Sequence, residues 1–83
     1  MMHELEVRRK LRDWIAKHAK KPLTAEFNDE TRMLELGILS SLDVVELVLF
    51  IEDLRGGEVD ADAIDPEAFT NISTLHSAFF AKL

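Results

Sequence analysis

The 83-residue chain contains no cysteine. This absence excludes disulfide bonds, thiolate catalysis and cysteine-based zinc sites, so the fold must be stabilised by packing alone. With 47% hydrophobic residues, the chain is long enough for one domain with a modest core, and we expect residues 1–83 to form a single domain. So small a domain leaves little room for a pocket built from several elements, which favours a binding or carrier role over an enzyme.

The sequence also lacks a long hydrophobic run. Its first residues are charged throughout and contain no apolar stretch of the kind found in a leader peptide. No run reaches the roughly 20 apolar residues that a membrane span requires. Together with the absence of cysteine, these features predict a soluble cytoplasmic protein without a membrane span.

Basic residues are scarce after residue 25. Residues 1–25 carry seven Lys and Arg against three Asp and Glu, a balance of +4, whereas residues 26–83 carry three against thirteen, a balance of −10. The acidic majority disfavours nucleic acid, whose phosphates it would repel, and favours basic protein partners. The mixed charges of the first 25 residues are typical of the solvated face of a helix.

Hydrophobic periodicity predicts a first amphipathic helix over residues 4–20, ended by Pro22. His18 lies near its apolar edge and is expected to be a partly buried structural histidine. Residues 22–40 show no sustained period and form a long connection with a turn at Gly37. Connections of this length usually carry function or wrap over the core.

After an acidic linker, Asp65 and Pro66 are expected to be the N-cap and first residue of a short third helix that runs through Ile72. Ser73 is expected to cap a last helix that closes the core. No run of residues is typical of a strand. The predicted fold is therefore all-α: a four-helix bundle with three longer helices, one short helix, and a long loop between the first two.

The second predicted helix starts at Ser40 or Ser41 and ends at Gly56 and Gly57, since glycine supplies the left-handed cap that stops a helix. Two apolar arcs lie on almost opposite sides of it. One arc consists of Val44, Leu47, Val48, Ile51 and Leu54. The other consists of Leu42, Val45 and Leu49, accompanied by the carboxylates Glu46, Glu52 and Asp53. This second arc is either an exposed contact surface for a basic partner or part of a helix buried on nearly all sides, and composition favours neither.

The two serines at the start of this helix have different predicted roles. The sequence SSLD predicts a capping box, in which Ser40 accepts a hydrogen bond from the backbone N–H of Asp43 and the Asp43 carboxylate reaches back. Capping accounts for Ser40 but gives Ser41 no structural role. Because a helix N-terminus offers free N–H groups and a positive dipole end, a hydroxyl there is well placed to carry a phosphate.

The segment LGILSSLDVVELVLFIED, followed by GGEVDADAIDPEAFTNISTLHSAF, resembles the acyl carrier protein family. The resemblance covers about residues 34–80 and joins, in order, a motif like Asp-Ser-Leu, an acidic helix, a glycine stop and two closing helices. It implies a free-standing, monomeric carrier that is not itself an enzyme. Its cofactor would be 4'-phosphopantetheine, which a phosphopantetheinyl transferase attaches to Ser41 through a phosphodiester and which holds an acyl or aminoacyl group as a thioester.

The resemblance also implies a docking face for acyl-loading and acyl-processing enzymes with basic patches. The implied contact residues are Leu42, Val45, Glu46, Leu49, Glu52 and Asp53, which belong to the second arc and favour its exposure. Two positions depart from the family pattern: Ser40 replaces an aspartate that helps the transferase recognise its target, and Arg55 lies where many members have a buried aromatic residue. The resemblance leaves the cargo open among fatty acyl, hydroxyacyl, polyketide and aminoacyl groups.

Three other functions compete with the carrier. A cofactor-free helical interaction domain would use the acidic face alone. A metal site at Asp60, Asp62 and Asp65 lacks the glycine and the distal glutamate of a calcium loop, so a solvated acidic linker is favoured there. An enzyme that uses Ser41 as a nucleophile lacks any visible base, and a serine hydroxyl is unreactive without one.

Overall fold

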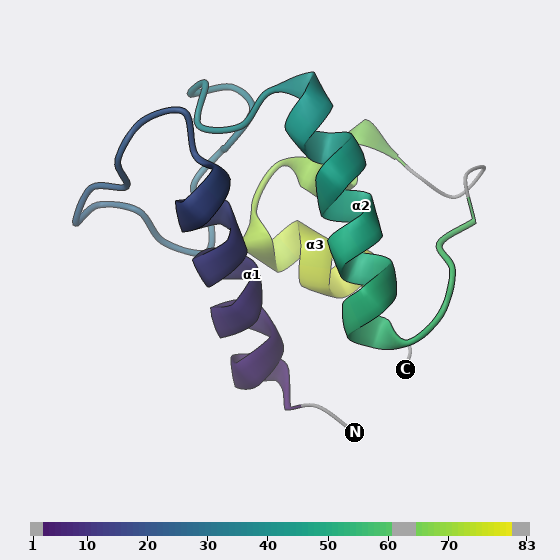
Figure 1. Cartoon of the computed structure of the whole chain (residues 1–83). Helices are drawn as coiled ribbons and strands as arrows, with labels where there is room; N and C mark the ends of the chain where they lie inside the picture. The colour runs from purple at the N-terminus through teal and green to yellow at the C-terminus, as the bar shows by residue number, and fades with distance from the viewer. Residues whose placement is uncertain (1–2, 61–64, 81–83) are drawn as a thin grey trace.

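The computed structural model describes residues 3–60 and 65–80, and these residues form helices joined by turns and loops (Figure 1). The elements, in order, are α1 (Glu4–His18), α2 (Ser41–Arg55), the 3₁₀ helix η2 (Pro66–Phe69) and α3 (Ile72–Phe79). No strand occurs within the described ranges, so the all-α prediction is confirmed. The lengths differ from the prediction, because only α1 and α2 are long, at 15 residues each, while α3 has eight.

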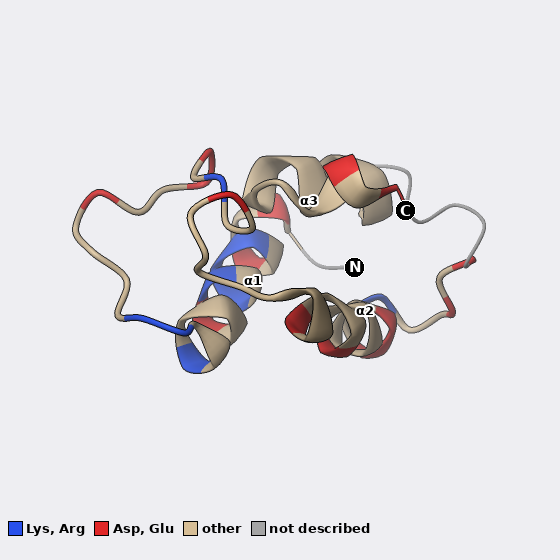
Figure 2. Cartoon of the chain, turned by 90° about the horizontal axis from the view of Figure 1, so that it is seen from above, with Lys and Arg blue, Asp and Glu red and all other residues tan. Residues whose placement is uncertain are grey.

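The helices are arranged in two layers. α1 and α2 lie beside each other, and α3 with η2 crosses behind them, as the two orthogonal views show (Figures 1 and 2). Stacked rings of Trp14 and Phe50, with centroids 5.8 Å apart, join α1 to α2. None of the described helices is both long enough and apolar enough to cross a membrane.

The core draws on every helix and on the long loop. Its buried side chains are Val7, Leu11, Ile15, Phe27, Met33, Ile38, Leu39, Leu47, Ile51, Phe69, Ile72, Leu75, Phe79 and Phe80. Burying one such side chain contributes about 1.5–3 kcal/mol. Four of these residues come from the loop before α2, so this loop wraps over the core.

α1 ends at His18, two residues earlier than predicted. Ala19 already has an extended backbone, and the N–H of Lys20 donates to the carbonyl of Ile38 at 2.9 Å instead of continuing the helix. His18 is half-buried, stacks on Trp14 with ring centroids 3.8 Å apart, and donates from Nδ1 to the Trp14 carbonyl oxygen at 2.9 Å. The prediction of a structural histidine is confirmed.

The predicted start of the last helix is wrong. A short helix does begin after Asp65, whose carboxylate accepts from the N–H of Glu67, but it is one 3₁₀ turn that ends at Phe69. Asn71, not Ser73, caps α3: its side chain accepts from the N–H of Thr74 at 2.8 Å, and the Thr74 hydroxyl accepts from the Asn71 N–H at 3.1 Å. The reciprocal pair satisfies two end groups at once, which a cap at Ser73 would not have done.

Ser73 serves a different purpose, in a polar cluster that anchors the long loop. The guanidinium of Arg8 donates to Asp29 and to the Ser73 hydroxyl, both at 2.9 Å, and pairs with Glu4 at 2.8 Å. The Ser73 hydroxyl in turn donates to Glu30 at 2.5 Å. These contacts fix the loop to both α1 and α3.

Candidate functional site

The start of α2 carries the capping box that the sequence predicts. Asp43 donates its backbone N–H to the Ser40 hydroxyl at 3.4 Å, and Asp43 Oδ2 accepts from the Ser40 backbone N–H at 2.8 Å. The Ser40 hydroxyl also donates to the same Oδ2 at 3.0 Å. The cap therefore joins Ser40 and Asp43 by three hydrogen bonds, and both side chains take part in it.

The carboxylate of Asp43 is buried, with 5% of the residue exposed. A buried charge needs compensation, and Asp43 receives it from the Ser40 hydrogen bonds and from Lys20, whose Nζ lies 3.5 Å from Oδ2. The backbone hydrogen bond from Ser40 is the main cause that lowers the pKa of Asp43, against the opposing effect of burial. This carboxylate is ionised at neutral pH, but it is not presented to solvent.

Ser41 is the first residue of α2 and is exposed. Within the part of the chain that the structure describes, its hydroxyl has no hydrogen-bond partner. The predicted capping role of Ser40 is confirmed. The Ser41 side chain takes no part in the cap and is exposed to solvent.

A pocket of about 230 Å³ opens beside Ser41. Besides Ser41 itself, its lining residues are Leu34, Val44, Pro66 and Phe69. They come from the long loop, α2 and η2, so the pocket forms only when three distant segments meet. Sequence reasoning missed it, because no local pattern marks residues that become neighbours through folding.

The two arcs of α2 face opposite environments. Leu47 and Ile51 are fully buried, and the rest of their arc is partly buried against the core. On the other arc, Leu42 is 80% exposed, and Val45 and Leu49 are each 62% exposed. The choice that composition left open is decided, since this second arc is a surface and not a second core face. We call Leu42, Val45 and Leu49 the apolar ridge.

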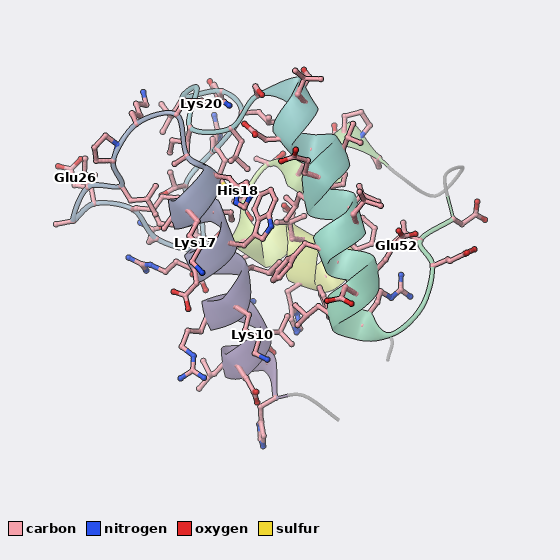
Figure 3. All side chains as sticks on the ribbon, in the orientation of Figure 1. Lys10, Lys17, His18, Lys20, Glu26 and Glu52 are labelled. Carbon is pink, nitrogen blue, oxygen red and sulfur yellow. The ribbon has the colours of Figure 1, made fainter. Side chains whose placement is uncertain are left out.

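The three carboxylates near the apolar ridge have different surroundings. Figure 2 shows acidic residues gathered on α2 and basic residues along α1. Glu46 and Asp53 are exposed, whereas Glu52 is half-buried and accepts a hydrogen bond from the N–H of Val59 at 2.9 Å (Figure 3). Glu52 therefore also orders the segment that follows α2, a role its position on the helical wheel does not reveal.

The end of α2 follows the glycine signal. Gly56 has φ of 73° in the left-handed region, and its N–H donates to the Glu52 carbonyl at 3.0 Å. A residue with a side chain is strained at this φ, which explains the glycine. Arg55, the last helical residue, is half-buried.

Metal ligation finds no support in the described residues. They include no group of three or more histidine and carboxylate side chains that could hold a metal ion. Asp62, one of the three aspartates considered for such a site, lies outside the described residues.

Comparisons with known proteins add no relative. A scan against protein-family models and a search of curated proteins both found no match. The resemblance to acyl carrier proteins therefore depends on the sequence of residues 34–80.

Proposed function

We propose that the protein is an acyl carrier protein that bears 4'-phosphopantetheine on Ser41. The observation that supports this proposal most is the difference in hydrogen bonding between the two serines at the start of α2. Ser40 and Asp43 use their polar groups in the cap, while the neighbouring Ser41 hydroxyl is exposed and has no structural partner among the described residues. A hydroxyl in this position is free to be modified without loss of the helix.

The location also suits a phosphodiester. Ser41 lies in the first turn of a 15-residue helix, where the unpaired N–H groups and the positive end of the dipole favour a negative charge. The buried Asp43 carboxylate is already neutralised by Lys20, which limits its repulsion of a phosphate. Both effects stabilise the modified form.

The proposed loading reaction takes place on a separate transferase. The Ser41 oxygen attacks the phosphorus of coenzyme A that bears pantetheine, an O–P bond forms, the pyrophosphate bond breaks, and 3',5'-ADP leaves. The serine proton passes to a base of the transferase. We assign this base to the transferase because no described residue of the chain is hydrogen-bonded to the Ser41 hydroxyl, and an unassisted serine hydroxyl is a weak nucleophile.

The apolar ridge is the proposed docking surface for the transferase and for enzymes that process the cargo. Its three side chains are largely exposed, and Glu46 and Asp53 add negative charge on the same helix. An apolar centre with an acidic rim fits a partner with an apolar groove and basic residues around it. Glu52 contributes less, because its carboxylate is already engaged with Val59.

The pocket beside Ser41 favours an apolar cargo. Leu34, Val44 and Phe69 bring hydrophobic side chains to its wall. A hydrocarbon chain gains about 0.8 kcal/mol for each methylene group that it buries. We propose an acyl group of modest length, carried in the cytoplasm by a monomer.

Mass spectrometry of the intact protein tests the proposal. Incubation with coenzyme A, Mg²⁺ and a transferase of broad specificity should add the mass of one phosphopantetheine group. Ser41→Ala should abolish the gain, and Ser40→Ala should retain it. If several unrelated transferases leave the wild-type mass unchanged, the carrier proposal fails.

A cofactor-free interaction domain is the second candidate, because the apolar ridge does not need Ser41 in order to bind a partner. The two functions differ in one respect that can be measured. A partner isolated with the wild-type protein should bind Ser41→Ala equally well if the domain works without a cofactor. A carrier requires Ser41 for transfer of the cargo even where docking persists.

A further inference from the structure

Lys20 lies where the end of α1 meets the start of α2 (Figure 3). Its backbone N–H donates to the carbonyl of Ile38 at 2.9 Å, which joins the two ends of the long loop. Its side chain reaches the start of α2, where Nζ lies 3.5 Å from Asp43 Oδ2. Both contacts act on the same junction, one through the backbone and one through the side chain.

Asp43 Oδ2 is the common acceptor at this junction. It receives the Ser40 backbone N–H, the Ser40 hydroxyl and the Lys20 ammonium. The first two groups belong to the cap itself, so Lys20 is the contact that ties the cap to another part of the molecule. Because Asp43 is 5% exposed while the Lys20 side chain is 58% exposed, the pair compensates a buried charge without burying a second one.

The first turn of a helix has the fewest backbone hydrogen bonds and frays most readily. Ser41 lies in this turn, between the two residues of the cap. The backbone at Ser41 is held in the helical conformation by the bonds that fold Asp43 back on Ser40. A group that holds the Asp43 carboxylate therefore supports the backbone position of Ser41 without touching Ser41.

We infer that Lys20 is a positioning residue for Ser41: by holding the Asp43 carboxylate in the capping box, it fixes the first turn of α2 in the conformation that the transferase modifies. The effect of Lys20 on modification by the transferase rests on the function proposed above. The effect of Lys20 on the order of the first turn of α2 is a property of the free protein, and it can be measured without any modification.

Lys20→Met in the full-length chain tests the inference. Methionine keeps much of the length of the side chain and removes the charge. Lys17→Met is the matched control, because Lys17 is an exposed lysine in the last turn of α1 with no ion pair among the described residues. Lys20→Arg is the conservative variant, which should restore the pair with Asp43. Far-UV circular dichroism checks that all three variants fold.

Two measurements on the free protein come first. In Lys20→Met, the pKa of Asp43 followed by carboxylate NMR should rise, and the amide hydrogens of residues 41–44 should exchange several-fold faster. The third measurement is the kinetics of loading, in which kcat/KM should fall several-fold, mainly through KM, since only the ordered fraction is competent. Lys20→Arg should resemble the wild type in all three, and Lys17→Met should change none.

The outcomes separate the two proposals. Unchanged amide exchange and an unchanged Asp43 pKa in Lys20→Met overturn the inference whatever the loading kinetics. A frayed first turn with unchanged loading also overturns it, because Lys20 would then support the helix only. If the wild-type protein is not loaded by any transferase, the carrier function itself fails, and the kinetic part of the inference falls with it.

Discussion

Ser40 and Asp43 close the start of α2 through hydrogen bonds in both directions. Asp43 donates its N–H to the Ser40 hydroxyl, and its Oδ2 accepts both the Ser40 N–H and the Ser40 hydroxyl. Ser41, which lies between them in sequence, takes no part in this exchange. The relationship gives two adjacent serines different surroundings, one bonded in the cap and one exposed, and it leads to the first three predictions.

Ser40→Ala should lower the free energy of unfolding by about 1 kcal/mol, the usual effect of losing an N-cap side chain. Ser41→Ala should change it by less than about 0.5 kcal/mol, because an exposed side chain without partners contributes little. Urea denaturation followed by circular dichroism measures both values. If Ser40 were the residue that gains phosphopantetheine, the assignment of the two serines would be reversed.

Asp43→Asn should destabilise the protein at pH 7 by about 1–2 kcal/mol, since hydrogen bonds to a charged acceptor are lost or weakened. The folded-state pKa of Asp43 is lowered from its ordinary value of 3.8. Its ionised form therefore contributes stability at pH values above 3.8, and this contribution is lost as the pH falls through the lower, folded-state pKa. The difference in free energy of unfolding between wild type and variant should shrink between pH 5 and this lower range. If the difference in free energy of unfolding did not change with pH, the charge of Asp43 would contribute nothing to stability, and only the packing and hydrogen-bonding geometry of its side chain would matter.

Under the proposed function, Ser40→Asp should speed modification by a general transferase, because it introduces a negative charge directly before Ser41. Ser40→Asn is the matched control, since asparagine caps a helix as well as aspartate does but carries no charge. Initial rates of loading measured at several salt concentrations compare the two. Equal rates for both variants would show that the charge at this position is unimportant here, and that the transferase recognises the chain through the apolar ridge.

Arg8→Met should remove the hydrogen bonds that hold the long loop to α1 and α3. Arg8 is hydrogen-bonded to Asp29 and Ser73, and its side chain is 21% exposed, so we expect a loss of about 1–2 kcal/mol in the free energy of unfolding. Hydrogen exchange should increase over residues 28–33 more than in α2. Arg9→Met provides the control, because Arg9 is exposed on the same helix. Similar effects of both changes would argue against a specific anchor.

Leu47→Ala and Leu49→Ala should differ sharply, although the two leucines are close in sequence. Leu47 is fully buried, so its truncation should cost about 2–5 kcal/mol. Leu49 is 62% exposed, and its truncation should leave the free energy of unfolding within about 0.5 kcal/mol of wild type while raising the KM of the transferase. Thermal or urea unfolding gives the first comparison and loading kinetics the second. A large loss of stability in Leu49→Ala would place the apolar ridge in an interface with other parts of the molecule.

Local signals predicted much of the site. The capping box at Ser40, the glycine stop at Gly56 and the start of η2 after Asp65 each depend on residues within one turn of one another. Such contacts are set by short-range chemistry and are therefore visible in a single sequence. The misplaced cap of α3 has a local cause too, because Asn71 and Ser73 are both good caps and the reciprocal bond with Thr74 decides between them.

The sequence alone thus predicted the helical structure of the described residues, the capping role of Ser40, and the existence of two apolar arcs on α2. Only the tertiary structure decided that the second arc is exposed, because three apolar residues beside three carboxylates are compatible with a surface and with a helix buried on nearly all sides. It also decided that Lys20 reaches Asp43, and that Leu34, Val44 and Phe69 meet beside Ser41. These contacts join segments from distant parts of the chain, and packing of the common core brings such segments together in a way that no local pattern specifies.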